Sequence, residues 1–319
     1  MFLAWASSAD SLLADARKHL VKNLGDGGPG SLREELATAQ GGDTISFAVH
    51  GTIVLTNGQL LLTKDLTIAG PGATKLAISG SGQSRVLQIL PGAAVSLFAL
   101  TICDGHAADG TAGISNSPVG GNGNCGGGIY NAGVLRMEQC IVSNCVAGNG
   151  GPGFTTRAFS SPDATNWIGG AGGRGGAIYN AGTLLLTACA LTSNSAGAGA
   201  DGGGAGQYGA AGNSGGGGGA IYNAGTMRLT ACAFERNAAG HGGTGYSLIY
   251  GQFDGGQPGG SGGNGGAVCD AGQTTTSMVD CQFSFNASGA GGIGSTPTSP
   301  FSQPARGGTK STNRGRGAI

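Results

Sequence analysis

Charge is scarce in this sequence. Only 10% of the 319 residues are charged, and 16 lysine and arginine residues balance 16 acidic residues for a formal net charge of zero. Proteins that bind nucleic acid or an anionic membrane by electrostatics need a basic surface, which this composition does not supply. We therefore expect no nucleic-acid partner. Residues 301–319 hold basic residues and no acidic residue, and we expect 293–319 to form a flexible basic tail.

Long apolar runs and metal-binding cysteine spacings are also missing. No apolar run approaches the ~18 residues of a membrane-spanning helix, so we expect no membrane span. Eight cysteines are too few for a disulfide scaffold in a chain of this length. None stands in a CxxC spacing, so we expect no metal and no cofactor. The apolar start of the chain lacks a basic segment, and residues 1–22 are expected to be a leader remnant or a lead-in.

Glycine, by contrast, is abundant, and one glycine motif recurs. The chain contains 70 glycines. The motif GGGIYNAG at 126–133 returns as GGAIYNAG at 175–182 and 218–225, and as GGAVCDAG at 265–272. Each copy continues through a short apolar stretch to a cysteine and then an asparagine: Cys140 and Asn144, Cys189 and Asn194, Cys232 and Asn237, Cys281 and Asn286. Such self-similarity indicates a solenoid.

Short alternating apolar segments begin at Thr44 and are separated by glycine-containing turns. Strands of three to five residues with no helix between them predict an all-β fold, a right-handed parallel β-helix with coils stacked ~4.8 Å apart. Ser31 opens an S-x-x-E capping box, so residues 31–40 predict a short helix that caps the first coil. We expect the β-helix domain to span 23–292. Its glycine-rich insertions, 145–174, 195–217 and 238–264, are expected to emerge on one side.

Alternation along the repeat assigns roles to the side chains, with the isoleucine of each motif pointing inward. An outward stack is expected from Tyr130, Tyr179 and Tyr222. A hydrogen-bonded ladder, placed where the chain bends and an asparagine tolerates left-handed backbone, is expected from Asn131, Asn180 and Asn223. A buried row is expected from Cys140, Cys189 and Cys232. A disulfide between Cys103 and Cys145, which fall near one position of neighbouring units, is left open.

Two segments resemble known families. Residues 25–106, with GDGGPGSLREELATAQGGDTISF, GTIVLTNGQLLLTKDLTIAGPG and LTICDG, resemble the start of bacterial secreted right-handed β-helix proteins of the pectate-lyase-like superfamily. The pairing of GGAI with FxxN, as at 218–221 with 234–237, is similar to the repeat of chlamydial polymorphic outer-membrane proteins, which are surface adhesins. These resemblances imply a β-helix and an extracellular or cell-surface location, but one fold hosts many activities.

The acidic residues are scattered, and we assign no catalytic residue. Enzymes of the pectate-lyase-like superfamily need carboxylates gathered for acid–base work or around calcium. Asp104 and Asp109 near His106 form the best local cluster, which we interpret as a polar turn. One aspartate stands in each insertion and would meet the others only if the insertions fold over one another: Asp163, Asp201 and Asp254.

The aromatic residues of the insertions are the candidate ligand contacts. They are Phe159, Trp167, Tyr208, Tyr246 and Tyr250. Exposed aromatic rings on loops can stack on sugars or insert into a partner, although they can also pin the loops to the helix flank. We expect a non-catalytic exported or cell-surface protein, adhesive or structural, which binds a polysaccharide or a surface protein through the insertions. The alternative is a polysaccharide lyase or hydrolase on the same fold, which a groove of clustered acids would favour.

Overall fold

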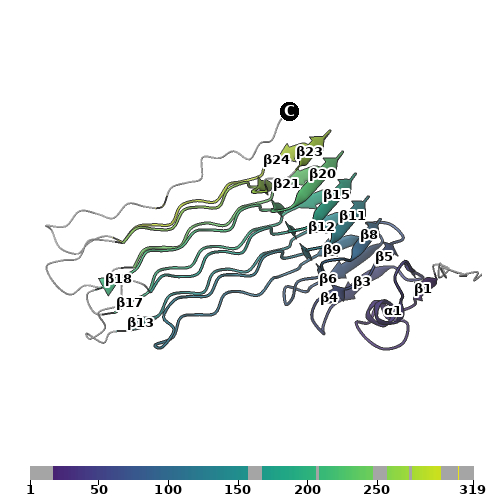
Figure 1. The fold of residues 1–319 in the computed structure, drawn as a ribbon, viewed down its shortest axis with the longest axis horizontal. Helices are drawn as coiled ribbons and strands as arrows, with labels where there is room; N and C mark the ends of the chain where they lie inside the picture. The colour runs from purple at the N-terminus through teal and green to yellow at the C-terminus, as the bar shows by residue number, and fades with distance from the viewer. Residues whose placement is uncertain are drawn as a thin grey trace, which may run out of the picture.

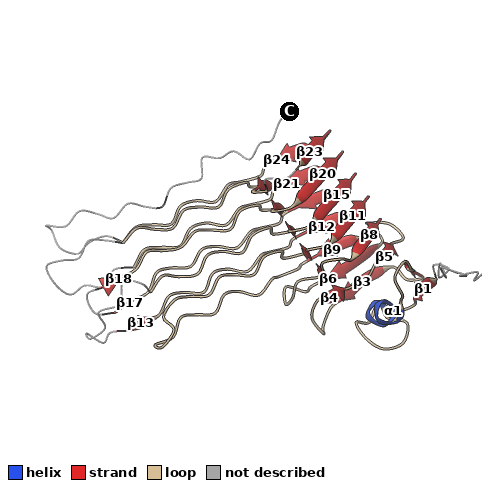
Figure 2. Ribbon diagram, in the orientation of Figure 1, coloured by secondary structure: helices blue, strands red, loops and turns tan. Residues whose placement is uncertain are grey.

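Most of the chain folds as short parallel strands stacked coil upon coil. The computed structural model describes residues 17–156, 167–205, 208–246, 257–272, 275–295 and 308. A full coil contributes one strand to each of three parallel sheets, and the sheets surround a shared core (Figures 1 and 2). The fold is the right-handed parallel β-helix that the sequence predicts.

Each sheet runs the length of the solenoid. The first has the order β1 (Lys18–Val21), β2 (Thr44–Phe47), β5 (Leu66–Ala69), β8 (Ala94–Phe98), β11 (Val134–Glu138), β15 (Thr183–Thr187), β20 (Thr226–Thr230), β23 (Thr276–Val279). The second is β22 (Val268–Asp270), β19 (Ile221–Asn223), β14 (Ile178–Asn180), β10 (Ile129–Asn131), β7 (Leu87–Ile89), β4 (Leu60–Leu62). The third is β24 (Gln282–Ser284), β21 (Ala233–Glu235), β16 (Ala190–Thr192), β12 (Ile141–Ser143), β9 (Thr101–Cys103), β6 (Leu76–Ser79), β3 (Gly51–Val54).

The core is built by stacking equivalent residues of successive repeats. Ile129 lies opposite Ile178, which in turn lies opposite Ile221, and all three side chains are fully buried. Burial of one such side chain contributes about 1.5–3 kcal/mol. Because side chains alternate along a strand, a register slip of one residue would carry a whole apolar row to the solvent face. The repeat therefore fixes both the core and the register.

A short helix covers the N-terminal coil, as predicted. Helix α1 (Leu32–Thr38) begins after Ser31, whose Oγ accepts a hydrogen bond from the backbone N–H of Glu34 at 3.3 Å. Leu32 and Leu36 are buried against the core. Within the expected lead-in, β1 pairs with β2 as the first strand of its sheet. No helix in the described part of the chain is long and apolar enough to cross a membrane.

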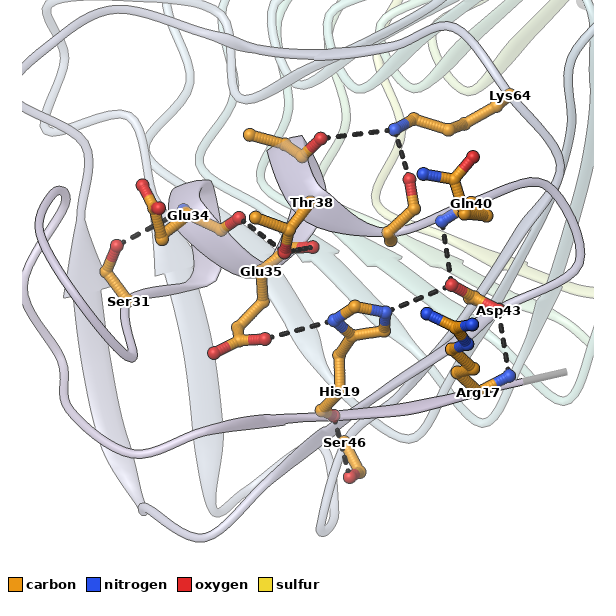
Figure 3. Close-up of polar contacts among 12 residues, drawn as sticks. Arg17, His19, Ser31, Glu34, Glu35, Thr38, Gln40, Asp43, Ser46 and Lys64 are labelled. Atoms are coloured by element: carbon orange, nitrogen blue, oxygen red, sulfur yellow. Dashed lines mark hydrogen bonds and ion pairs between the residues drawn. The ribbon is translucent and has the colours of Figure 1, made fainter.

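A polar cluster ties β1 to this cap (Figure 3). His19 lies between two carboxylates, with Nδ1 3.1 Å from Glu35 Oε2 and Nε2 3.0 Å from Asp43 Oδ2. Asp43 also accepts hydrogen bonds from the backbone N–H of Gln40 at 2.7 Å and of Arg17 at 2.8 Å. These contacts join strand, helix and the following turn, so we interpret the cluster as the fastening of the cap.

Acid is therefore expected to loosen the cap. The backbone N–H groups of Gln40 and Arg17 lower the pKa of Asp43 from 3.8 to about 2. A carboxylate with a depressed pKa stabilises the fold above its unfolded pKa and ceases to do so as the pH falls through its folded pKa. The urea midpoint of the wild type should fall between pH 4 and about pH 2, and Asp43→Asn should flatten that part of the curve. Equal slopes in both proteins would contradict this role of Asp43.

The asparagine ladder is present in the second sheet. Asn131 Nδ2 donates to Asn180 Oδ1 and Asn180 Nδ2 to Asn223 Oδ1, each at 2.7 Å, and Asn223 Nδ2 donates to Asp270 Oδ1 at 2.9 Å. The three asparagines are fully buried. The expectation of left-handed backbone here is wrong, because these residues end extended strands. Left-handed residues other than glycine recur instead at the corners on both sides of the third sheet, as at Gln139 with a φ of 52° and Asn144 with a φ of 53°.

A second ladder corrects the assignment of Asn144. Asn194 Nδ2 donates to Asn237 Oδ1, and Asn237 Nδ2 to Asn286 Oδ1, both at 2.9 Å. In the first copy the equivalent position is Cys145, whose backbone N–H donates to Asn194 Oδ1 at 3.0 Å. Asn144 is one residue out of phase and exposed. Cys103 and Cys145 are both free thiols, and Cys103 lies opposite Ser143 rather than opposite Cys145.

Candidate functional site

The glycine-rich insertions form an ordered body beside the β-helix. They leave the coil at one corner, where His106, Val146, Ser195, Ala238 and Ala287 are bridged from coil to coil. Outgoing segments and returning segments then run side by side away from the sheets (Figure 1). The outgoing segments are 107–113, 147–154, 196–203, 239–246 and 288–295, and the returning segments are 118–125, 167–174, 209–217 and 257–264. The outgoing segments form one layer and the returning segments form a second, and we call the two layers together the glycine slab.

Backbone hydrogen bonds hold the slab together with a period of three residues. Gly199 N–H donates to His241 O at 2.8 Å, in the next outgoing segment, and Gly202 N–H repeats this bond to Thr244 O at 3.0 Å. Ala200 N–H donates across the layers to Gly170 O at 2.9 Å. A period of three without strand pairing is that of the polyproline II helix. The described parts of the insertions are thus bundled polyproline II segments.

Glycine is required because the layers approach backbone to backbone. A Cβ on Gly172 would overlap the carbonyl oxygen of Gly197 in the other layer, and one on Gly215 would overlap that of Gly240. Collagen uses glycine at every third position for the same reason of crowding. Gly308 takes part too, because its N–H donates to Gly292 O at 2.6 Å, as Gly260 N–H does to Gly243 O.

Of every three backbone N–H groups, one donates within its layer and one donates to the other layer, and the third does neither. Four of these groups are capped by a side chain of the preceding segment. Asp109 Oδ1 accepts from Asn149 N–H at 2.6 Å, and Asn149 Oδ1 accepts from Ala198 N–H at 2.9 Å. Asp201 Oδ1 accepts from Thr244 N–H at 2.6 Å, and Asn122 Oδ1 accepts from Ala171 N–H at 2.8 Å on the other layer. Short polar side chains therefore satisfy the outer face.

The outer faces of the slab carry one side chain per three residues. Adjacent positions are spaced about 4.8 Å from coil to coil and about 9 Å along a segment. The outgoing face carries Asp109, Asn149, Ala198, His241 and Ala290 in one row and Ala112, Pro152, Asp201, Thr244 and Ile293 in the next. The returning face carries Val119, Ile168, Ala211 and Pro258, then Asn122, Ala171, Ser214 and Ser261. Both faces are regular grids of small, mostly uncharged side chains.

Of the predicted aromatic contacts, Trp167 is not where we expected it. Its side chain is 5% exposed and packs with Phe154 and Ala210 in a small second core, with the Phe154 and Trp167 ring centroids 5.4 Å apart. Tyr246 is partly buried. Tyr208 belongs to β18 (Tyr208–Gly209), in a sheet with β13 (Thr155–Thr156) and β17 (Gly204–Ala205). Phe159 and Tyr250 lie outside the described residues.

The acidic residues singled out from the sequence have structural contacts. Asp104 Oδ2 accepts from the hydroxyl of Ser79 at 3.0 Å, and Asp109 lies 3.4 Å from His106 Nε2. Asp109 and Asp201 also cap outward N–H groups in separate parts of the slab. Asp163 and Asp254 lie outside the described residues. Within the described ranges, no group of three or more His, Cys, Asp or Glu residues is placed to hold a metal ion.

The tyrosine stack is present, and cations cover it. The rings of Tyr130, Tyr179 and Tyr222 are stacked with centroids 5.1 and 5.5 Å apart. Arg85 lies over the Tyr130 ring at 5.4 Å, and Arg174 lies over the Tyr222 ring at 4.9 Å. Burial raises the pKa of Tyr179 and of Tyr222. The ring faces are therefore occupied by one another and by guanidinium groups, so this column serves the fold more than a ligand.

Comparisons with known proteins leave the family open. No family model matches the chain, and no curated protein matches it. Among solved structures, the chain is similar to one described as "Geobacillus virus E2 - ORF18", with 13% sequence identity and a TM-score of 0.29. That similarity covers 83% of this chain and 62% of the other, so this chain spans less than two thirds of the viral protein. At this TM-score the similarity supports no functional conclusion.

The glycine slab is the feature that reasoning from the sequence missed. Its signal is the spacing of the glycines, GxGGxG, which occurs as GNGGPG at 148–153, GHGGTG at 240–245 and GAGGIG at 289–294. The x positions are those that face outward. Our interpretation of the sequence did not use this spacing, whose period of three predicts bundled polyproline II segments.

Proposed function

We propose that the protein is a non-catalytic, exported or cell-surface adhesive protein whose binding element is the glycine slab. The observation that carries the proposal is the hydrogen-bonded order of the slab, which projects from the β-helix as a flat two-layered body. Affinity at such a surface does not have to offset the ordering of a flexible loop, because the backbone is already fixed. The β-helix is then the scaffold that sets the spacing of the segments.

The chemistry of the outer faces favours a neutral, repeating partner. Hydroxyl and amide side chains such as Thr244, Ser261 and Asn122 recur on a grid together with small apolar residues. A polymer with a regular array of hydroxyl groups matches such a grid over many weak contacts, which add up when they are presented together. We therefore place polysaccharides first among the partners and a repetitive surface protein second.

A binding screen on immobilised polysaccharides tests this proposal, with product detection on the same polymers. Thr244→Arg on the outgoing face or Ser261→Arg on the returning face should weaken binding by about tenfold, because a long cation disrupts a flat contact. Thr187→Arg is the matched control, since Thr187 is exposed on the outer face of the first sheet. Its affinity should stay within about twofold of wild type.

Two outcomes would overturn the proposal. Equal loss of binding in the Thr187 variant would place the ligand on the β-helix rather than on the slab. New reducing ends or unsaturated products would make the protein a polysaccharide lyase or hydrolase, and the search for acid–base residues would resume outside the slab faces.

A further inference from the structure

Four cysteines form a column at the corner between the first and third sheets. They are Cys140, Cys189, Cys232 and Cys281. The strands on both sides of each cysteine pair in register, with Glu138 opposite Thr187 before it and Ile141 opposite Ala190 after it. The cysteines of successive coils therefore lie directly opposite one another. The residue before each of them is left-handed, which repeats the same corner in every coil.

The geometry of the column suits disulfide bonds. Coils stack about 4.8 Å apart, which falls within the Cα separations that disulfides span. Each thiol donates to the carbonyl two residues earlier, at 3.3 Å for Cys140 and Cys189 and 3.4 Å for Cys232 and Cys281, so the sulfurs share one orientation.

We propose that this column is a redox modification site that closes two coil-to-coil disulfides, Cys140–Cys189 and Cys232–Cys281, on exposure to a low-molecular-weight disulfide. All four thiols are free in the structure. The pairing follows from the linear order of the column, because it is the one arrangement that leaves no member unpaired. The other cysteines lack such partners in register, since Cys103 lies opposite Ser143 and Cys269 opposite Tyr222.

The reaction is thiol–disulfide exchange, and it balances for each bond. The Cys281 thiol, as its thiolate, attacks the external disulfide, forms a mixed disulfide and releases one external thiol. Cys232 then attacks the Cys281 sulfur, forms the Cys232–Cys281 bond and releases the second external thiol. Two protein thiols are oxidised to one disulfide, and one external disulfide is reduced to two thiols. Cys281 is the entry point because it is half-buried, whereas Cys232 is buried.

The thiols along this route differ in how readily they form the thiolate. The neighbouring Cys189 side chain lowers the pKa of Cys232, which favours the thiolate of Cys232 in the second step. Burial raises the pKa of Cys281. The first step should therefore be slow near neutral pH and become faster as the pH rises from 7 to 9.

The inner pair is reached through the outer one. Cys189 attacks Cys232 in the first disulfide and frees Cys281, and Cys140 then attacks Cys189 and frees Cys232. A second external disulfide closes Cys232–Cys281 again. Each bond closes a loop that contains one complete insertion, so oxidation crosslinks the coils before and after two of the insertions. Loops of this length should raise Tm by on the order of 10 °C for each bond.

The test uses the full chain, reduced, freed of reductant and then incubated while folded with oxidised glutathione at pH 8. Free thiols are counted by alkylation, and crosslinked peptides are mapped by mass spectrometry. We expect four of the eight thiols to disappear, with crosslinks Cys140–Cys189 and Cys232–Cys281 and a higher Tm. The rate of thiol loss should rise from pH 7 to pH 9.

Two alanine variants make the pairing falsifiable. Cys189→Ala should lose two thiols and retain the Cys232–Cys281 crosslink alone, whereas Cys103→Ala should behave like the wild type. Circular dichroism checks that each variant folds. Eight persistent thiols, glutathione adducts without internal bonds, or crosslinks that involve Cys103, Cys125, Cys145 or Cys269 in the folded protein would overturn the proposal.

Discussion

Gly216→Ala is expected to destabilise the glycine slab by about 3 kcal/mol, which is large for the addition of one methyl group. The new Cβ would overlap the carbonyl oxygen of Gly173 and lie 2.7 Å from its carbonyl carbon. These are backbone atoms, which cannot rotate away as the end of a side chain can. The neighbouring returning segments would therefore have to shift apart, and bonds to the other layer such as that from Gly240 N–H to Gly216 O would be lost.

Hydrogen exchange reads this effect at the level of single amides. Exchange at Gly240 should be about 100-fold faster in the variant, while amides in the β-helix core change little. Gly41→Ala is the matched control, because a Cβ at Gly41 meets nothing within 4 Å and its φ is not left-handed. Its effect should remain below about 0.5 kcal/mol. Unchanged protection at Gly240 in Gly216→Ala would mean that the segments of the slab are not packed in this way in solution.

The repeats made the β-helix predictable from sequence. A motif that returns with its isoleucine, tyrosine and asparagine in the same order can bury its apolar face only by stacking on its own copies. Register then follows, because Ile178 has one equivalent above and one below. The capping helix could also be predicted from the sequence, since Ser31 and the apolar spacing that follows it are local signals.

The slab was not predicted because glycine can have two opposite effects on the chain, and composition alone does not distinguish them. A glycine adds chain entropy where nothing surrounds it, and it permits close packing where backbones meet. Gly216 belongs to the second case, which its neighbours in space decide. The same reasoning explains Trp167, which we expected to be exposed in a glycine-rich segment. Once the layers pack, a space between them has to be filled, and Trp167 fills it with Phe154.

The asparagine ladder carries the second large expected effect. Asn180→Leu should cost about 4 kcal/mol of unfolding free energy, because a buried amide with partners on both sides is replaced by an apolar group. Asn131 loses the acceptor that Asn180 Oδ1 provides, and Asn223 loses the donor that Asn180 Nδ2 provides. Urea unfolding measures the change. Asn122→Leu is the matched control, since Asn122 is exposed and caps a single N–H, and it should cost at most about 1 kcal/mol.

The ladder is also directional, which Asn180→Asp tests without a change of size. Asn180 Nδ2 donates to Asn223 Oδ1, to Thr226 O at 3.0 Å and to Gly182 O at 3.2 Å. A carboxylate there would face three acceptors in a buried site, so its pKa would be raised above that of an ordinary aspartate. A group with a raised folded pKa contributes stability at low pH and loses that contribution as the pH rises through it. Asn180→Asp should therefore be relatively more stable at pH 4 than at pH 8 in urea unfolding, and the opposite trend would mean that the amides run in the other direction.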